Sequence, residues 1–203
     1  FKEVRAIELD RESVAFLKEN FVPKGLKLME GDFLDARNDE MFFHDDVLIL
    51  GNFPYNISSQ IVFKVLDNIS KVKGFGGMFQ KEVAERVASA PCSKDYGVLS
   101  ILIQAFYEVE YLFDVKPECF NPPPKVMSGV IRLTRRTEAI PMKSEKAFRL
   151  LVKTAFNQRR KTLRNALKSL LPAEELQKEL YNKRAEELSV ATFAELSFLL
   201  FTA

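Results

Sequence analysis

The sequence predicts an α/β protein in which a sheet with helices on its faces precedes a small all-α domain. Short apolar segments alternate with amphipathic helical segments over about the first ninety residues, and this order is typical of a parallel sheet covered by helices. From residue 145 onward, apolar residues recur at helical spacing instead. We therefore expect one domain at residues 1–137 and a helical domain at residues 138–203, joined through a linker at 137–144.

Each element has a local sequence signal. We expect strands at 4–9, 26–29, 46–50 and 73–80, and helices at 11–20, from Ser58 or Ser59 onward, and at 81–90. Residues 46–50 are apolar enough for a strand buried on both faces. Two later strands, at 109–115 and 126–133, flank three prolines and are expected to pair antiparallel at the end of the sheet. The last helix should begin with a capping box at Thr192–Glu195.

The composition excludes several classes of site. The chain has 203 residues, 47% of them hydrophobic and 29% charged, with no apolar run of membrane-spanning length. Cys92 and Cys119 lie far apart, and His44 is the only histidine. A Cys/His zinc site and a catalytic triad built on histidine are therefore not expected. This use of cysteine fits a cytoplasmic protein.

The stretch Gly51-Asn52-Phe53-Pro54-Tyr55 is the sharpest candidate for a site. It follows an apolar strand and precedes a helix, so it should lie at the carboxyl edge of the sheet, where ligands bind. The Asn52 side-chain oxygen and the Phe53 carbonyl are suited to accept hydrogen bonds from an exocyclic aromatic amine. Pro54 stiffens the turn, and Tyr55 offers a face for a base. A purely structural Asn-X-Pro turn is the alternative.

Two carboxylates follow earlier strands. Glu8 ends the first strand and Asp32 follows the second, so both should share the edge that holds Asn52. A carboxylate at a strand tip is suited to accept the hydroxyl groups of a ribose, and a second carboxylate an adenine amine.

A basic segment lies in the helical part. From residue 153 to residue 168 the chain has six cationic and no acidic residues. The candidates for an RNA-backbone contact are Asn157, Gln158, Arg159, Arg160, Lys161 and Arg164. A solvated helix face is the alternative.

Five motifs together resemble one known family. They are Gly51–Ser58, Phe79–Val83, Tyr96–Gly97 with Leu99–Ser100, Phe120–Val126 and Phe156–Lys161. In this order, over nearly the whole chain, they resemble the small-subunit ribosomal RNA adenine dimethyltransferases, the bacterial enzymes whose loss gives kasugamycin resistance. The Pro-Pro-Pro-Lys-Val and Asn-Gln-Arg-Arg-Lys motifs are far more specific than the Asn-Phe-Pro-Tyr turn. The family usually has leucine where Phe53 stands, at a position that contributes mainly its carbonyl.

The resemblance implies a Rossmann-like, S-adenosylmethionine-dependent methyltransferase domain and a helical RNA-binding domain. The family dimethylates N6 of two adjacent adenosines in a hairpin loop near the 3′ end of small-subunit (16S) rRNA. This activity implies a role in small-subunit biogenesis and a partner in the immature 30S particle. A cytoplasmic monomer that uses no metal and no membrane is expected.

The resemblance also assigns roles by motif position. Glu8 would hold the cofactor ribose, Asp32 the cofactor adenine amine, and Phe33 would pack beside that adenine. Asn52 would border both cofactor and target.

Asn52, Phe53, Pro54 and Tyr55 would then form the acceptor site for the target adenine. Tyr55 and Phe120 would sandwich that adenine once it is flipped from its stack.

Three alternatives stay open. A 23S rRNA adenine N6-methyltransferase of the macrolide-resistance type shares the Asn-X-Pro-Tyr turn but fits the later motifs less well. A DNA adenine methyltransferase would more often show Asp-Pro-Pro-Tyr. A non-catalytic RNA-binding factor of ribosome assembly is the third.

One feature departs from the family, because no Gly-rich turn of the Glu/Asp-x-Gly-x-Gly-x-Gly type precedes Glu8. That turn cradles the methionine part of the cofactor in the family, and the first strand of the sheet is expected to be lacking with it. We therefore expect residues 1–203 alone to bind no cofactor and to be inactive. Isothermal titration of the chain with S-adenosylmethionine should give no binding heat, and micromolar binding would show the expectation wrong.

Overall fold

The computed structural model describes residues 3–35, 37, 39–158 and 160–200, with the backbone alone at residue 41. The strands are β1 (Arg5–Glu8), β2 (Lys27–Glu30), β3 (Val47–Asn52), β4 (Val72–Gln80), β5 (Tyr107–Val115) and β6 (Ser128–Arg135). The α-helices are α1 (Arg11–Asn20), α2 (Asp39–Phe42), α3 (Ser58–Asp67), α4 (Lys81–Ala88), α5 (Val98–Gln104), α6 (Glu145–Asn157), α7 (Leu163–Ala166) and α8 (Val190–Ser197). None of these helices is both long and apolar enough to cross a membrane, within the described ranges.

The chain divides into two compact units. Unit 1 comprises Phe1–Leu48 and Ser59–Lys73, and unit 2 comprises Ile49–Ser58 and Gly74–Ala203. Strands β3 and β4 therefore begin in unit 1 and end in unit 2. The domain boundary expected at residues 137/138 stays a prediction.

Unit 1 begins with a parallel strand–helix–strand arrangement. Strands β1 and β2 pair in parallel, with Glu8 opposite Glu30. Asp10 caps α1 as expected, because its side chain accepts a hydrogen bond of 2.8 Å from the Ser13 amide.

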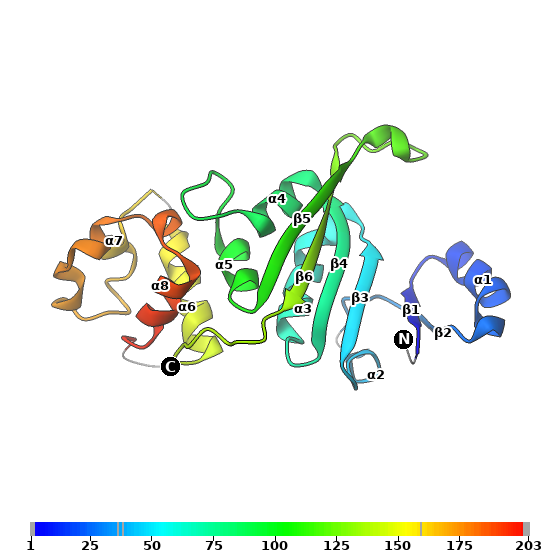
Figure 1. Ribbon diagram of the computed structural model, residues 1–203, viewed down its shortest axis with the longest axis horizontal. Coiled ribbons are helices and arrows are strands. Elements are labelled where there is room, and N and C mark those ends of the chain that lie inside the picture. The colour runs from blue at the N-terminus through cyan, green and yellow to red at the C-terminus, as the bar shows by residue number, and fades with distance from the viewer. Residues whose placement is uncertain (1–2, 36, 38, 159, 201–203) are drawn as a thin grey trace. The chain divides into compact units, whose positions relative to one another are not determined.

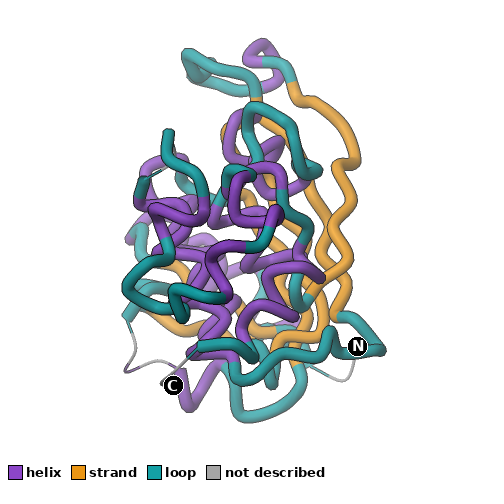
Figure 2. The backbone as a smooth tube through the Cα atoms, turned by 90° about the vertical axis from the view of Figure 1, so that its left-hand side faces the viewer, coloured by secondary structure: helices purple, strands orange, loops and turns teal. Residues whose placement is uncertain are grey.

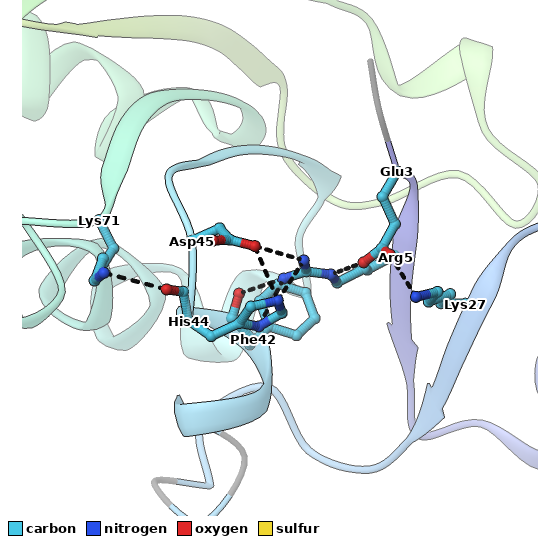
Figure 3. A network of polar contacts seen from close by, with 7 residues as sticks. All are labelled: Glu3, Arg5, Lys27, Phe42, His44, Asp45 and Lys71. Atoms are coloured by element: carbon cyan, nitrogen blue, oxygen red, sulfur yellow. Dashed lines mark hydrogen bonds and ion pairs between the residues drawn. The ribbon is translucent and has the colours of Figure 1, made fainter.

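A polar network fixes β1 against the segment before β3 (Figure 3). Arg5 donates to the Phe42 carbonyl at 3.3 Å and approaches the His44 ring at 2.8 Å. Glu3 binds both Arg5 and Lys27. The hydrogen bond from Lys27, followed by that from Arg5, lowers the pKa of Glu3 to about 2. The single histidine is thus part of a structural ion-pair network of unit 1.

The second sheet is mixed, with the strand order β3-β4-β6-β5 (Figure 1). Backbone hydrogen bonds from Val47 to Lys71 and from Phe53 to Met78 run in the parallel sense between β3 and β4. Strand β6 is antiparallel to both β4 and β5, which confirms the antiparallel pair expected at the end of the sheet. A bulge between Tyr111 and Phe113 interrupts the register of β5, which is the edge strand.

Strand β3 corrects one expectation. It is not buried on both faces, because Leu48 is 57% and Leu50 78% exposed while Ile49 between them is buried. The physical reason is that β3 lies at the edge of its sheet, where an apolar run does not guarantee cover on each side.

Helices α4 and α5 pack beside β5 and β6 in unit 2. The buried face of α4 is Val83, Ala84 and Val87. Helix α5 was not expected from the sequence, because residues 99–103 are all buried. A helix that is buried all round carries no amphipathic period to reveal it.

The end of the chain contains helices and loops without strands over residues 138–158 and 160–200 (Figure 2). Helix α6 buries one face and packs against α5, α7 and α8. The cap of α8 differs from the expected Thr192. Ser189 accepts the hydrogen bond from the Thr192 amide, and the helix begins at Val190. Ser189 takes the cap position in place of Thr192 because serine is an equally good N-cap residue and stands three residues earlier.

Glycines of β3 and β4 make room for a stack of three aromatic rings. The Phe53 ring lies parallel to those of Phe75 and Phe79, with centroids 5.2 and 5.3 Å away. A Cβ at Gly77 would come within 2.7–2.9 Å of all three rings, and one at Gly51 within 2.6 Å of Phe53. The stack thus requires both glycines.

Replacing Gly77 with alanine should lower the free energy of unfolding by about 1–3 kcal/mol, because the added methyl group overpacks the stack. Urea unfolding followed by circular dichroism measures this change. Gly97→Ser is the control, since a Cβ at this helix cap would lie 4.0 Å from the Asp95 carbonyl oxygen, an ordinary contact distance, and it should change stability by less than about 0.5 kcal/mol. Adding Phe53→Leu to Gly77→Ala should recover part of the loss. A fully stable Gly77→Ala variant would show that the stack tolerates a larger residue.

Candidate functional site

The turn after β3 is held by hydrogen bonds of its own backbone. The Phe53 amide donates to the Met78 carbonyl of β4 at 3.2 Å, which continues the strand pairing past Asn52. Ser58, buried at the start of α3, donates its hydroxyl to the carbonyls of Pro54 and Tyr55 at 3.3 and 3.0 Å. The turn is therefore rigid at both ends.

Asn52 is the exposed member of this turn. No hydrogen bond joins its side chain to another residue in the described part of the chain. The Phe53 ring, by contrast, is packed in the aromatic stack, so that residue offers only its backbone to a ligand. This arrangement places an exposed amide side chain next to a fixed backbone, and their role as acceptors for an aromatic amine stays a prediction.

Tyr55 is anchored through its hydroxyl group. Its Oη makes a short hydrogen bond to the Ser128 hydroxyl at the start of β6. Ser128 is fully buried and Tyr55 is half-buried. The bond fixes one edge of the ring and involves neither ring face.

Phe120 lies in the loop that precedes Ser128. It follows a 3-10 turn, η4 (Pro117–Cys119), and its amide donates to the Pro117 carbonyl at 3.1 Å. No direct contact joins its ring to that of Tyr55 among the ring pairs of the described residues. Tyr55 is thus hydrogen-bonded to the first residue of β6, which follows the loop that carries Phe120, and the sandwich of both rings around a base stays a prediction.

Glu8 and Asp32 lie at the carboxyl end of the β1–β2 pair in unit 1. Glu8 Oε1 accepts from the amides of Leu9 and Asp10 at 2.8 and 2.9 Å. Its second oxygen has no partner among the residues described, so it fits a ribose hydroxyl group. Asp32 Oδ1 accepts from the Leu34 amide at 2.8 Å. The parallel pairing of these strand ends confirms the expected placement of both carboxylates, whereas their convergence with Asn52 in the other sheet stays a prediction.

A buried lysine, which sequence reasoning missed, holds the loop after β2. Lys64 on α3 is 8% exposed. Its ammonium group donates to the Asp35 carbonyl at 3.2 Å, pairs with Asp39 at 2.5 Å and lies 5.6 Å from the centre of the Phe33 ring. The Phe33 ring also contacts Phe42 and Phe43, edge to face. Lys64 thus fixes the segment that carries two predicted cofactor residues.

The basic segment of residues 153–168 is not one helix, in contrast to the helix face considered from the sequence, because it begins in α6 and continues through α7. Helix α6 ends at Asn157 and α7 begins at Leu163. Thr162 precedes the first residue of α7 with an extended backbone conformation, which ends the helical path between α6 and α7. The exposed members are Asn157, Gln158, Arg160 and Lys161.

Two members of the basic segment need separate comment. Arg164 is half-buried and donates to the Leu176 carbonyl at 2.9 Å, so it also supports the helical part. Arg159 lies outside the described residues.

No group of three or more His, Cys, Asp or Glu residues lies close enough to hold a metal ion in the part of the chain that the structure describes. The expectation that no metal takes part stays a prediction.

Comparison with solved structures shows the fold. A dimethyladenosine transferase from Plasmodium falciparum has a TM-score of 0.80 at 24% identity, covering 99% of this chain and 85% of that one. The 23S rRNA methyltransferase ErmE has a TM-score of 0.74 at 21% identity, covering 99% and 83%. At these identities the likeness shows the fold, which is that of the Rossmann-like methyltransferases.

Sequence comparison is more specific. The family model described as ribosomal RNA adenine dimethylase matches residues 1–200. The "Ribosomal RNA small subunit methyltransferase A" of Phocaeicola vulgatus is 52% identical over 198 residues, covering 97% of this chain and 71% of the relative. The protein of the same name from Porphyromonas gingivalis is 49% identical over 201 residues, covering 98% and 78%. This chain belongs to the ribosomal RNA adenine dimethylase family.

Lys64 gives a testable prediction for the loop after β2. Lys64→Met removes the ammonium group and leaves the Asp39 carboxylate and the Asp35 carbonyl without their partner. The free energy of unfolding should fall by about 1–3 kcal/mol, and amide hydrogen exchange should accelerate at residues 32–35. Lys73→Met is the matched control, because its ion pair with Asp46 is largely exposed, and it should cost less than about 1 kcal/mol. Equal effects of the two variants would contradict a special role for Lys64.

Proposed function

We propose that this protein uses S-adenosylmethionine to dimethylate N6 of two adjacent adenosines in a hairpin loop near the 3′ end of small-subunit rRNA. The observation that carries the proposal is the family match over residues 1–200, together with relatives about half identical to this chain that are named small-subunit rRNA methyltransferases. The geometry of the turn after β3 supports it, because a free Asn52 amide stands beside a fixed backbone.

When bound, S-adenosylmethionine supplies an electrophilic methyl group on a sulfonium sulfur. In the proposed site, Glu8 would accept from the ribose hydroxyl groups, Asp32 would accept from the adenine amine of the cofactor, and Phe33 would pack beside that adenine. Lys64 keeps Phe33 in place through the contacts described above.

The target adenine needs help to act as a nucleophile, because the lone pair of its N6 is delocalised into the ring. The Asn52 side-chain oxygen and the Phe53 carbonyl accept hydrogen bonds from the two N–H groups and favour the tetrahedral form. Pro54 stiffens the turn, and Tyr55 and Phe120 stack on the two faces of the flipped base. N6 would take the methyl group as the S–C bond breaks with its electron pair left on sulfur, and the amine would lose a proton to water.

Between the alternatives, the relatives favour the small-subunit substrate. The similar sequences at 46–52% identity are named for the small ribosomal subunit, whereas the 23S enzyme shares 21% identity and shows the fold alone. A non-catalytic assembly factor would not need the exposed Asn52 amide. We further propose that the protein acts as a monomer in the cytoplasm on the immature 30S particle.

A deletion of the gene tests the activity in the source organism. Mass spectrometry of small-subunit rRNA from the deletion strain should show no N6,N6-dimethyladenosine. A gene copy that encodes Asn52→Ala should leave the modification at least about 100-fold below the wild-type level, given the size of losses for removed transition-state hydrogen bonds. A copy that encodes Asn56→Ala, with an exposed amide one turn away, should restore it. Unchanged dimethyladenosine in the deletion strain would refute the proposed function.

The basic turn gives a second test, on RNA binding. Changing Arg159, Arg160 and Lys161 together to alanine should weaken binding to immature small subunits and reduce the dependence of the affinity on salt. The log–log slope should fall by roughly one unit for each RNA phosphate that the variant no longer neutralises. Affinity measured at several salt concentrations reports the slope. Changing Lys18, Lys24 and Lys73 together to alanine removes the same number of charges elsewhere on the chain and controls for net charge. An unchanged slope in the triple variant would remove the segment from the RNA interface.

A further inference from the structure

One end of β4, one end of β5 and one end of β6 lie side by side in the sheet, where the loop that carries Phe120 leaves it. Strand β4 ends at Gln80, β5 ends at Val115 and β6 begins at Ser128. Ser128 is in register with both Gln80 and Val115. The loop of residues 116–127, which we call the proline loop, therefore starts and finishes at this single point (Figure 1).

Lys81 binds both ends of the proline loop. Its amide donates to the Met127 carbonyl at 2.9 Å, at the end of the loop. Its ammonium group pairs with Asp114 Oδ2 at 2.6 Å, two residues before the loop begins. One residue of α4 thus holds the last residue of the loop and the strand from which it starts.

Asp114 has a second partner that fixes its other oxygen. The Tyr111 hydroxyl donates a short hydrogen bond to Asp114 Oδ1. The bond to Lys81, followed by that from Tyr111, lowers the pKa of Asp114, and the bond to Asp114 raises the pKa of Lys81. Glu85 is a further charged group near the cluster, 3.8 Å from the Lys81 ammonium.

The backbone leaves space for this cluster. A Cβ at Gly129 would lie 2.5 Å from the Tyr111 hydroxyl oxygen and 2.9 Å from the Ala84 Cβ. Glycine at this position therefore lets Tyr111 reach Asp114 and lets α4 approach β6. Ser128, the residue before Gly129, is hydrogen-bonded to the Tyr55 hydroxyl group.

We propose that Lys81, Asp114 and Tyr111 are positioning residues that hold the proline loop so that Phe120 faces Tyr55 across the target base. This inference rests on the proposed function, because it assigns these three residues to the acceptor half of that site. None of them touches the reacting atoms.

The Lys81–Asp114 ion pair is partly exposed, so its role in positioning the proline loop can be distinguished from a contribution to global stability. The side chains of Lys81 and Asp114 are 34% and 35% exposed, and ion pairs of this kind contribute little to global stability. Their loss should therefore leave the fold intact and act on the loop. The Arg132–Glu110 pair provides a matched control, since it also involves β5 and β6, is 2.6 Å long and is exposed, but lies in mid-strand.

Steady-state methyl transfer by the purified gene product to small subunits from the deletion strain tests the inference. Lys81→Met and Asp114→Asn should each lower kcat/KM for the subunits about tenfold and leave KM for S-adenosylmethionine within twofold of wild type. The double variant should be no worse than either single variant, because both remove the same interaction. Lys81→Arg should restore most of the activity.

Each outcome either supports or overturns the positioning role. Arg132→Met and Glu110→Gln should behave as wild type. If Lys81→Met and Asp114→Asn are fully active, if their losses multiply in the double variant, or if they raise KM for S-adenosylmethionine equally, the positioning role is overturned while the proposed function stands. If the wild-type protein transfers no methyl group, both proposals fail.

Discussion

The packing of the Phe53 ring over two glycines is the constraint on which the candidate site depends. A ring can lie flat against the backbone of β4 only where side chains are missing, and Gly51 and Gly77 supply that space. Immediately after Asn52, the Phe53 ring packs on Phe75 and Phe79 of β4, and the Phe53 amide continues the strand pairing. The side chain of Phe53 is thus used for packing so that its backbone can face a ligand.

A hydrogen bond links that turn to the start of β6, two strands away in the sheet. Tyr55 reaches Ser128, and Ser128 lies between the last residues of two neighbouring strands. The aromatic residues proposed to hold the base, Tyr55 and Phe120, come from segments far apart in the sequence. A buried serine at the start of β6 anchors the first of them, and the loop that carries the second ends just before that serine.

Much of this architecture was predictable because its signals are local. Alternating apolar segments indicate the strands, Asp10 identifies a helix start, and the Asn-Phe-Pro-Tyr turn directly follows a strand. The features that were missed depend on partners distant in the sequence. Helix α5 is buried all round, so it has no polar face to mark it, and Leu50 is exposed because of its place in the sheet. Lys64 resembles any helical lysine until its neighbours Asp35 and Asp39 are known.

The bulge in β5 has a consequence for association between molecules. This strand is nine residues long and lies at the edge of its sheet, with one row of backbone N–H and C=O groups available to another strand. A straight edge of that length is a template for intermolecular β-pairing. The extra residue at Leu112 breaks the repeat of the hydrogen-bonding groups, and exposed charged side chains such as Glu108 and Glu110 line the strand. A bulged and charged edge of this kind disfavours the regular pairing through which sheets of separate molecules aggregate.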